Sequence, residues 1–117
     1  MTLAELAARI GARVYTPGGA AAVDVGRVWA GDRISDLLNE AVDNVLLVSN
    51  LASTHLIRVA ELMDVPGICL VAGREPDADM LAAARAHGTL LMSSPYGLFE
   101  TCGRLYQCLS AEAPTVR

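Results

Sequence analysis

Six polar residues could contact a ligand, because each follows a predicted strand or lies near the start of a predicted helix. Their carboxylate, hydroxyl, amide, imidazole and guanidinium groups can hold a small polar molecule by hydrogen bonds and charge. No catalytic set is formed by their spacing, so we expect a binding role and no catalytic residue. The six candidates are Asp32, Ser35, Asn50, His55, Arg74 and Ser94.

Each candidate also has an ordinary structural explanation, which the sequence leaves open. Ser94, just before Pro95, can cap the final helix. Arg74 can form a surface ion pair, and His55 can be a partly buried, hydrogen-bonded side chain.

The motifs of several common active sites are absent from the sequence. His55 and His87 form neither a His-x-x-x-His nor a His-Glu-x-x-His pattern, and Ser94 does not lie in Gly-x-Ser-x-Gly. The three cysteines have no Cys-x-x-Cys spacing, which argues against a zinc site and a disulfide framework. We therefore expect no metal site and no cofactor.

The spacing Gly26-x-x-x-x-Gly31 is that of a phosphate-binding loop, but Asp32 holds the position where such a loop needs lysine. A carboxylate at that position would repel phosphate. The chain contains no lysine at all, because its nine basic residues are all arginines. This excludes Schiff-base catalysis by the chain and any phosphate-loop lysine.

Composition predicts a folded domain that binds neither nucleic acid nor a membrane. The 117 residues suit one domain, and 53% of them are apolar, enough for a core. The net charge of −4 and the 4% aromatic content disfavour binding to phosphate backbones or anionic lipids. No apolar run approaches the roughly 20 residues of a membrane span, and no signal peptide is recognisable, so we expect a cytoplasmic protein.

Strands and helices alternate along most of the chain. This order is typical of parallel βαβ units, and the later strands are apolar on both faces. We expect a single layered α/β domain over residues 1–117 with a mostly parallel sheet, an ordered core at residues 2–109 and a tail at 110–117. The predicted strands are 13–16, 25–30, 44–49, 67–72 and 89–93, and the predicted helices are 2–10, 34–41, 53–63, 77–87 and 95–109.

The candidate residues are expected to gather at one edge of this sheet. Ligands of parallel sheets bind beyond the carboxyl ends of the strands, beside helix N-termini. The sequence places polar residues at four such ends, with Arg74 at the rim. These ends are Gly31-Asp32, Ser49-Asn50, Gly73-Arg74 and Ser93-Ser94.

A wide apolar stripe on the C-terminal helix has two explanations. It could be a self-association surface, from which we expect a homodimer, or it could fill the core of a monomer. The stripe consists of Leu98, Phe99, Cys102, Leu105, Tyr106 and Leu109.

Five segments, in this order and spacing, resemble the DRTGG domain family over roughly residues 2–109. The first, Trp29-Ala30-Gly31-Asp32-Arg33-Ile34-Ser35, is similar to the family's aromatic-x-Gly-Asp-x-x-Ser element. The others are His55 to Ala60, Gly67 to Gly73 followed by Pro76-Asp77, Leu90 to Ser94, and Phe99 to Tyr106.

The chain departs from this family at the name-giving Asp-Arg-Thr-Gly-Gly, whose place is held by Asp24-Val25-Gly26-Arg27-Val28. The segment Asp36-Leu37-Leu38-Asn39 also resembles the family's Asp-Leu-Leu-Ser, so two registers are open. One register carries over Asp32 and Ser35, and the other carries over Asp36 alone.

The resemblance implies a fold similar to the N-terminal domain of HPr kinase/phosphorylase and the middle domain of phosphotransacetylase. It also implies a non-enzymatic regulatory or ligand-sensing domain for a small molecule or nucleotide, linked to hydrogenase or signalling systems. The sequence argues against kinase activity, because it lacks a phosphate-binding loop and contains no lysine. The alternatives are a protein-interaction or scaffold subunit that binds a protein partner and no small molecule, and a phosphotransfer protein that uses His55.

Overall fold

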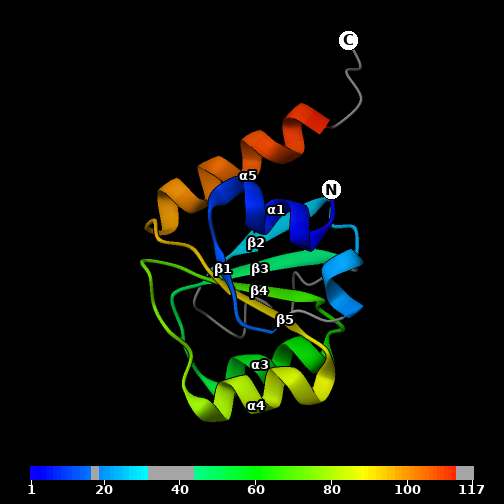
Figure 1. Cartoon of the computed structure of the whole chain (residues 1–117), viewed down its shortest axis with the longest axis vertical. Coiled ribbons are helices and arrows are strands. Elements are labelled where there is room, and N and C mark those ends of the chain that lie inside the picture. Colours follow the sequence, from blue (N-terminus) through cyan, green and yellow to red (C-terminus); the bar gives the residue numbers. More distant parts are fainter. Residues whose placement is uncertain (17–18, 32–43, 113–117) are drawn as a thin grey trace.

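The computed structural model describes residues 1–16, 19–31 and 44–112, which form three layers. A five-stranded sheet lies between two pairs of helices, with α1 and α5 on one face and α3 and α4 on the other (Figure 1). The predicted helix at residues 34–41 lies outside the described residues. The helices are α1 (Leu3–Ile10), α3 (Thr54–Leu62), α4 (Ala78–His87) and α5 (Leu98–Glu112).

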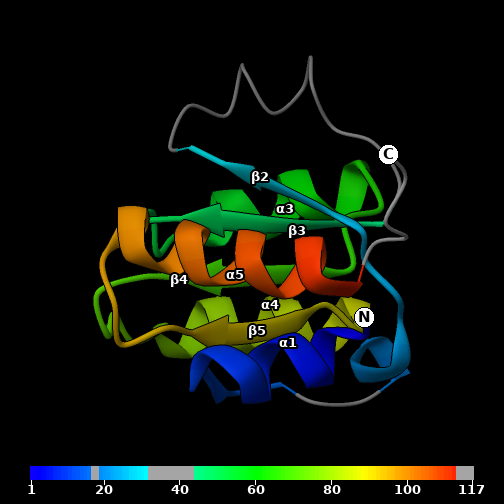
Figure 2. The same cartoon turned by 90° about the horizontal axis from the view of Figure 1, so that it is seen from above.

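The sheet has the order β1-β5-β4-β3-β2, and its last four strands are parallel (Figure 2). Strand β1 pairs with β5 in the antiparallel sense. The structure therefore confirms the predicted α/β fold with a mostly parallel sheet. The strands are β1 (Arg13–Val14), β2 (Arg27–Ala30), β3 (Val45–Ser49), β4 (Gly67–Leu70) and β5 (Leu90–Ser93).

The register brings the carboxyl ends of three neighbouring strands to the same level. Leu70 at the end of β4 is opposite Ser49 of β3 and Ser93 of β5. The residues that follow these strands consequently emerge at one edge of the sheet, which we call the carboxyl edge.

Side chains of the central strands alternate between two cores. Leu46, Val48 and Met92 pack toward α1 and α5, whereas Leu47 and Leu91 pack toward α3 and α4. All five are fully or almost fully buried, which explains why the strands are apolar at every position. The same burial applies to Cys69, as expected of a cysteine in a core strand.

Helix α1 begins at a capping box formed by Thr2 and Glu5. The Thr2 hydroxyl accepts a hydrogen bond from the Glu5 amide at 3.1 Å, and the Glu5 carboxylate accepts one from the Thr2 amide at 2.8 Å. The hydrogen bond from the Thr2 amide to the Glu5 carboxylate is the main reason why the pKa of Glu5 lies below its ordinary value. Gly11 ends the helix in the left-handed conformation, with φ 69°.

Several predicted boundaries differ from the structure. Strand β1 ends at Val14 rather than at residue 16, and a short 3-10 helix, for which no element was predicted, spans Gly19–Ala22. Helix α5 begins at Leu98 rather than at Pro95, because the residues before it form a hydrogen-bonded turn. It continues to Glu112, into the segment predicted as a tail.

The capping box predicts a measurable loss of stability in Thr2→Ala. Without the hydroxyl, the Glu5 amide loses its acceptor, and we expect unfolding free energy to fall by about 1 kcal/mol. Urea denaturation measures this, and Thr2→Ser is the matched control that keeps the hydroxyl. The pKa of Glu5 is lower in the folded state than in the unfolded state. The contribution of Glu5 to the free energy of unfolding is therefore present above the unfolded-state pKa and is lost as the pH falls through the folded-state pKa. An equal loss in both variants would contradict the capping role.

Candidate functional site

Four of the six predicted site residues lie at or near the carboxyl edge. Asn50 follows β3, Arg74 follows the turn after β4, Ser94 follows β5, and His55 lies in the first turn of α3. The side chains of Asn50, His55 and Arg74 are exposed, while Ser94 is fully buried. The other two candidates, Asp32 and Ser35, lie outside the described residues.

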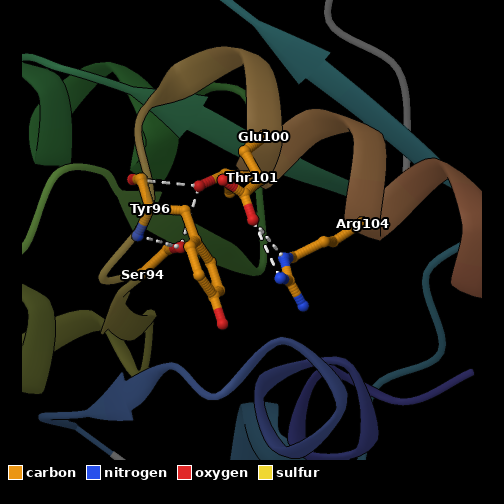
Figure 3. Close-up of polar contacts among 5 residues, drawn as sticks. All are labelled: Ser94, Tyr96, Glu100, Thr101 and Arg104. Carbon is orange, nitrogen blue, oxygen red and sulfur yellow. Dashed lines mark hydrogen bonds and ion pairs between the residues drawn. The ribbon is translucent and has the colours of Figure 1, made fainter.

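The Ser94 hydroxyl is held by a buried network within the fold (Figure 3). It lies 2.8 Å from the Thr101 hydroxyl and accepts a hydrogen bond from the Tyr96 amide at 3.2 Å. The Thr101 hydroxyl donates to the Tyr96 carbonyl at 3.2 Å, which leaves Ser94 to donate to Thr101. Contact with a ligand would require this network to open, so in this structure Ser94 fixes the turn before α5.

A tight turn after β4 contains two consecutive left-handed residues. Ala72 has φ 58° and Gly73 has φ 66°, and the turn is closed by the Arg74 amide, which donates to the Val71 carbonyl at 3.1 Å. The left-handed region costs a residue with a side chain roughly 1–2 kcal/mol. Ala72 is therefore strained, and contacts outside the turn must hold it.

Those contacts come from the segment after β5. The Ala72 amide donates to the Tyr96 carbonyl at 2.6 Å, and the Gly73 amide donates to the Ser94 carbonyl at 2.8 Å. The Ser93 hydroxyl donates to the Arg74 carbonyl at 2.7 Å. The two segments after β4 and β5 thus form one hydrogen-bonded unit at the carboxyl edge.

A hollow of about 180 Å³ opens beside this unit. Arg13, Tyr15 and Glu75 are among the residues that line it, and the Arg13 guanidinium stacks on the Tyr15 ring with 5.1 Å from its central carbon to the ring centroid. The volume is below the roughly 300–1,000 Å³ of typical small-molecule pockets, so it suits a small group or one end of a ligand. The lining residues are Gly11, Arg13, Tyr15, Gly73, Glu75, Ser93 and Pro95.

The sequence interpretation missed Arg13. This residue is opposite Ser93 because β1 runs antiparallel to β5, which places the first residue of β1 at the carboxyl edge. No local pattern around Arg13 indicates a partner so far along the chain. Arg13 could have been placed at this edge only by predicting that the first strand pairs with β5 in the antiparallel sense.

The start of α5 is anchored to the same turn through Arg104. Its guanidinium lies over the Tyr96 ring, 3.9 Å from the centroid, and binds the Glu100 carboxylate through two nitrogens at 3.0 and 2.8 Å (Figure 3). All three side chains are at least partly exposed, so these contacts orient the helix more than they stabilise the fold.

Burial governs the chemistry of the cysteines. Desolvation raises the pKa of Cys69 to about 12, although a backbone contact with Ser94 acts in the opposite sense. Desolvation also raises the pKa of Cys102, which is half-buried. Neither thiol has the lowered pKa of a reactive cysteine.

Residues 1–16, 19–31 and 44–112 contain no group of three histidine, cysteine or acidic side chains that could hold a metal ion. No helix in these segments is long and apolar enough to span a membrane.

The fold has a counterpart among solved structures. It superimposes with a TM-score of 0.77 on the CBS and DRTGG domains of the regulatory region of a Clostridium perfringens pyrophosphatase, solved with its activator diadenosine tetraphosphate. The alignment covers 91% of this chain at 12% identity, and the chain spans 46% of the length of that neighbour. No protein-family model and no curated protein matches the sequence. The fold is thus that of a DRTGG-like domain, as the resemblance predicts.

The buried network predicts that Thr101→Val destabilises the domain by about 1–3 kcal/mol, because the Ser94 hydroxyl loses its buried acceptor. Chemical denaturation measures the change. Thr54→Val, the same substitution at a half-buried position of α3, is the control and should change stability by only about 0.5 kcal/mol. Equal effects of the two substitutions would show that the network contributes nothing.

Burial of Cys69 predicts that its thiol reacts only when the domain unfolds. A variant that keeps Cys69 alone, with Cys102→Ser and Cys108→Ser, should resist Ellman's reagent in buffer and react fully in denaturant. A variant that keeps Cys108 alone, which is half-buried, should react much faster in buffer. Rapid native reaction of Cys69 would contradict the raised pKa and the burial.

Proposed function

We propose that this chain is a regulatory domain that binds a small molecule at the carboxyl edge and has no catalytic activity of its own. The observation that carries the proposal is the hollow with its Arg13 side chain, placed where parallel sheets bind ligands. Support also comes from the neighbour, in which this fold belongs to the regulatory region of an enzyme.

The charges at this edge favour a ligand that carries a negative group. Arg13 and Glu75 line the hollow, and Arg74 follows Gly73, which also lines it, so two guanidinium groups accompany one carboxylate here. Both side chains are exposed, in a chain whose net charge is −4. A guanidinium binds phosphate or carboxylate through paired hydrogen bonds, so an anionic group of the ligand would occupy the hollow.

The rest of the ligand would extend over the neighbouring strand ends. Asn50 follows β3 and His55 lies in the first turn of α3. Both side chains are exposed and can hydrogen-bond polar atoms of a ligand there. The N-termini of α3 and α4 are already capped by Ser53 and Asp77, which accept from the amides three residues on. The side chains at this edge, rather than these helix ends, would therefore provide the specificity.

Nucleotides are the first ligands to test. They combine an anionic group with a polar ring system, and the neighbouring regulatory region was solved with diadenosine tetraphosphate. Such a sensing role would fit a cytoplasmic protein in the signalling or hydrogenase systems that the resemblance implies.

Binding should raise the thermal stability of the domain. A nucleotide at 100 times its dissociation constant adds about 2.7 kcal/mol to the unfolding free energy. Thermal unfolding and calorimetry with diadenosine tetraphosphate, ATP, AMP and inorganic phosphate measure this. We expect Arg13→Ala to weaken binding at least tenfold, which corresponds to about 1.4 kcal/mol.

Arg58→Ala is the matched control, since it removes the same charge from an exposed position within α3. It should leave affinity unchanged. Absence of a shift with every compound, or equal weakening by both arginine variants, would count against a site at the carboxyl edge.

A second candidate function, a protein-interaction subunit, has one observation in its favour. Phe99 and Tyr106 on α5 are 92% and 72% exposed, which is unusual for aromatic side chains on one helix face.

A further inference from the structure

Glu75 is the one acidic residue among the described residues that line the carboxyl-edge hollow. Its side chain is exposed, and its carboxylate has no hydrogen bond or ion pair within residues 1–16, 19–31 and 44–112. Arg13 lines the same hollow and stacks on Tyr15, but it does not pair with Glu75. A carboxylate repels a phosphate or another carboxylate, so a ligand with only an anionic group would leave Glu75 without a role.

The main chain at Glu75 is held on both sides. The Ser93 hydroxyl donates to the Arg74 carbonyl at 2.7 Å, and this carbonyl belongs to the peptide group that joins Arg74 to Glu75. Pro76 follows and is buried, and a proline restricts the residue before it to extended backbone conformations. The exposed carboxylate is therefore carried by a fixed segment of the carboxyl edge.

The order of the strands puts Glu75 and Arg13 on opposite sides of the hollow. Arg13 belongs to β1 and Glu75 follows β4, and β5 lies between these two strands. Adjacent strands are about 4.8 Å apart, so the two sides come from strands about 10 Å apart. The hollow thus combines a cation and an anion that leave room for a ligand between them.

We infer that Glu75 accepts hydrogen bonds from the hydroxyl groups of a ribose, and that the ligand is a ribonucleotide whose phosphate Arg13 binds. The inference rests on the proposed function, because it assigns a partner to one more residue of the same site. Carboxylates bind ribose hydroxyls at the strand ends of other parallel sheets. The sugar of a nucleotide lies between phosphate and base, as β4 lies between β1 and β3 in the sheet.

The charges at this edge favour a neutral hydroxyl donor over an ammonium group. Arg13 and Arg74 together with Glu75 carry one net positive charge. A phosphate attached to a neutral sugar balances that charge, whereas the zwitterion of an amino acid brings no net charge to it. The same three residues therefore fit a sugar phosphate better than an amino acid.

Comparison of AMP with dideoxy-AMP, which lacks both sugar hydroxyls, tests the role of Glu75. Calorimetry should show that the native chain binds AMP about tenfold more tightly, the ratio expected when a hydrogen bond to a charged group is lost. In Glu75→Ala the ratio should fall to about twofold or less. Dideoxy-AMP should bind this variant at least as tightly as the native chain, because a repelling carboxylate has been removed.

Asp79→Ala is the matched control, since it removes one exposed carboxylate from the first turn of α4 at the same edge of the sheet. It should keep the native preference for AMP. Glu75→Gln retains an acceptor without the charge, so its preference should lie between those of the native chain and Glu75→Ala. Circular dichroism verifies that each variant is folded.

Three results would overturn the inference. They are an equal preference for AMP in the native chain and Glu75→Ala, an equal loss of preference in Glu75→Ala and Asp79→Ala, and tighter binding of glutamate than of AMP. If AMP binding still depends on Arg13 in the first case, the proposed function stands and the role of Glu75 alone fails. A native chain that binds none of these compounds contradicts both.

Discussion

The segments after β4 and β5 are joined by main-chain hydrogen bonds, and much of the described structure depends on that joint. The Ala72 and Gly73 amides donate to the Tyr96 and Ser94 carbonyls, and this holds a strained left-handed residue in place. The buried Ser94–Thr101 hydroxyl pair then connects the joint to the first turns of α5. These bonds fix the wall of the hollow beside Gly73 and the orientation of α5 relative to the sheet.

Most of the fold could be predicted because its signals are local. The capping side chains of Thr2, Ser53 and Asp77 act on amides three residues away, so helix starts are visible in the sequence. Strands such as Val45–Ser49 are apolar at nearly every position because both faces are covered. The order of these elements was then sufficient to indicate a parallel sheet and the edge where its strands end.

The candidate site was less predictable, because its geometry comes from contacts between distant segments. Arg13 reaches the carboxyl edge through an antiparallel pairing with residues about eighty positions away, which no local pattern encodes. Ser94 has the residue type of a ligand contact, but its burial beneath Thr101 follows from where α5 begins. The predicted helix start at Pro95 was wrong for the same reason, since the turn at Tyr96 uses the hydrogen-bonding groups that a helix would need.

The position of α5 has a mechanical consequence. Its first turns are joined to the segment beside the hollow through the Ser94–Thr101 hydroxyl pair, and its outward face carries the exposed Phe99 and Tyr106. A molecule that moved the Tyr96 turn would therefore also move these two aromatic side chains. Occupancy at the carboxyl edge would then change the surface that α5 presents to its surroundings.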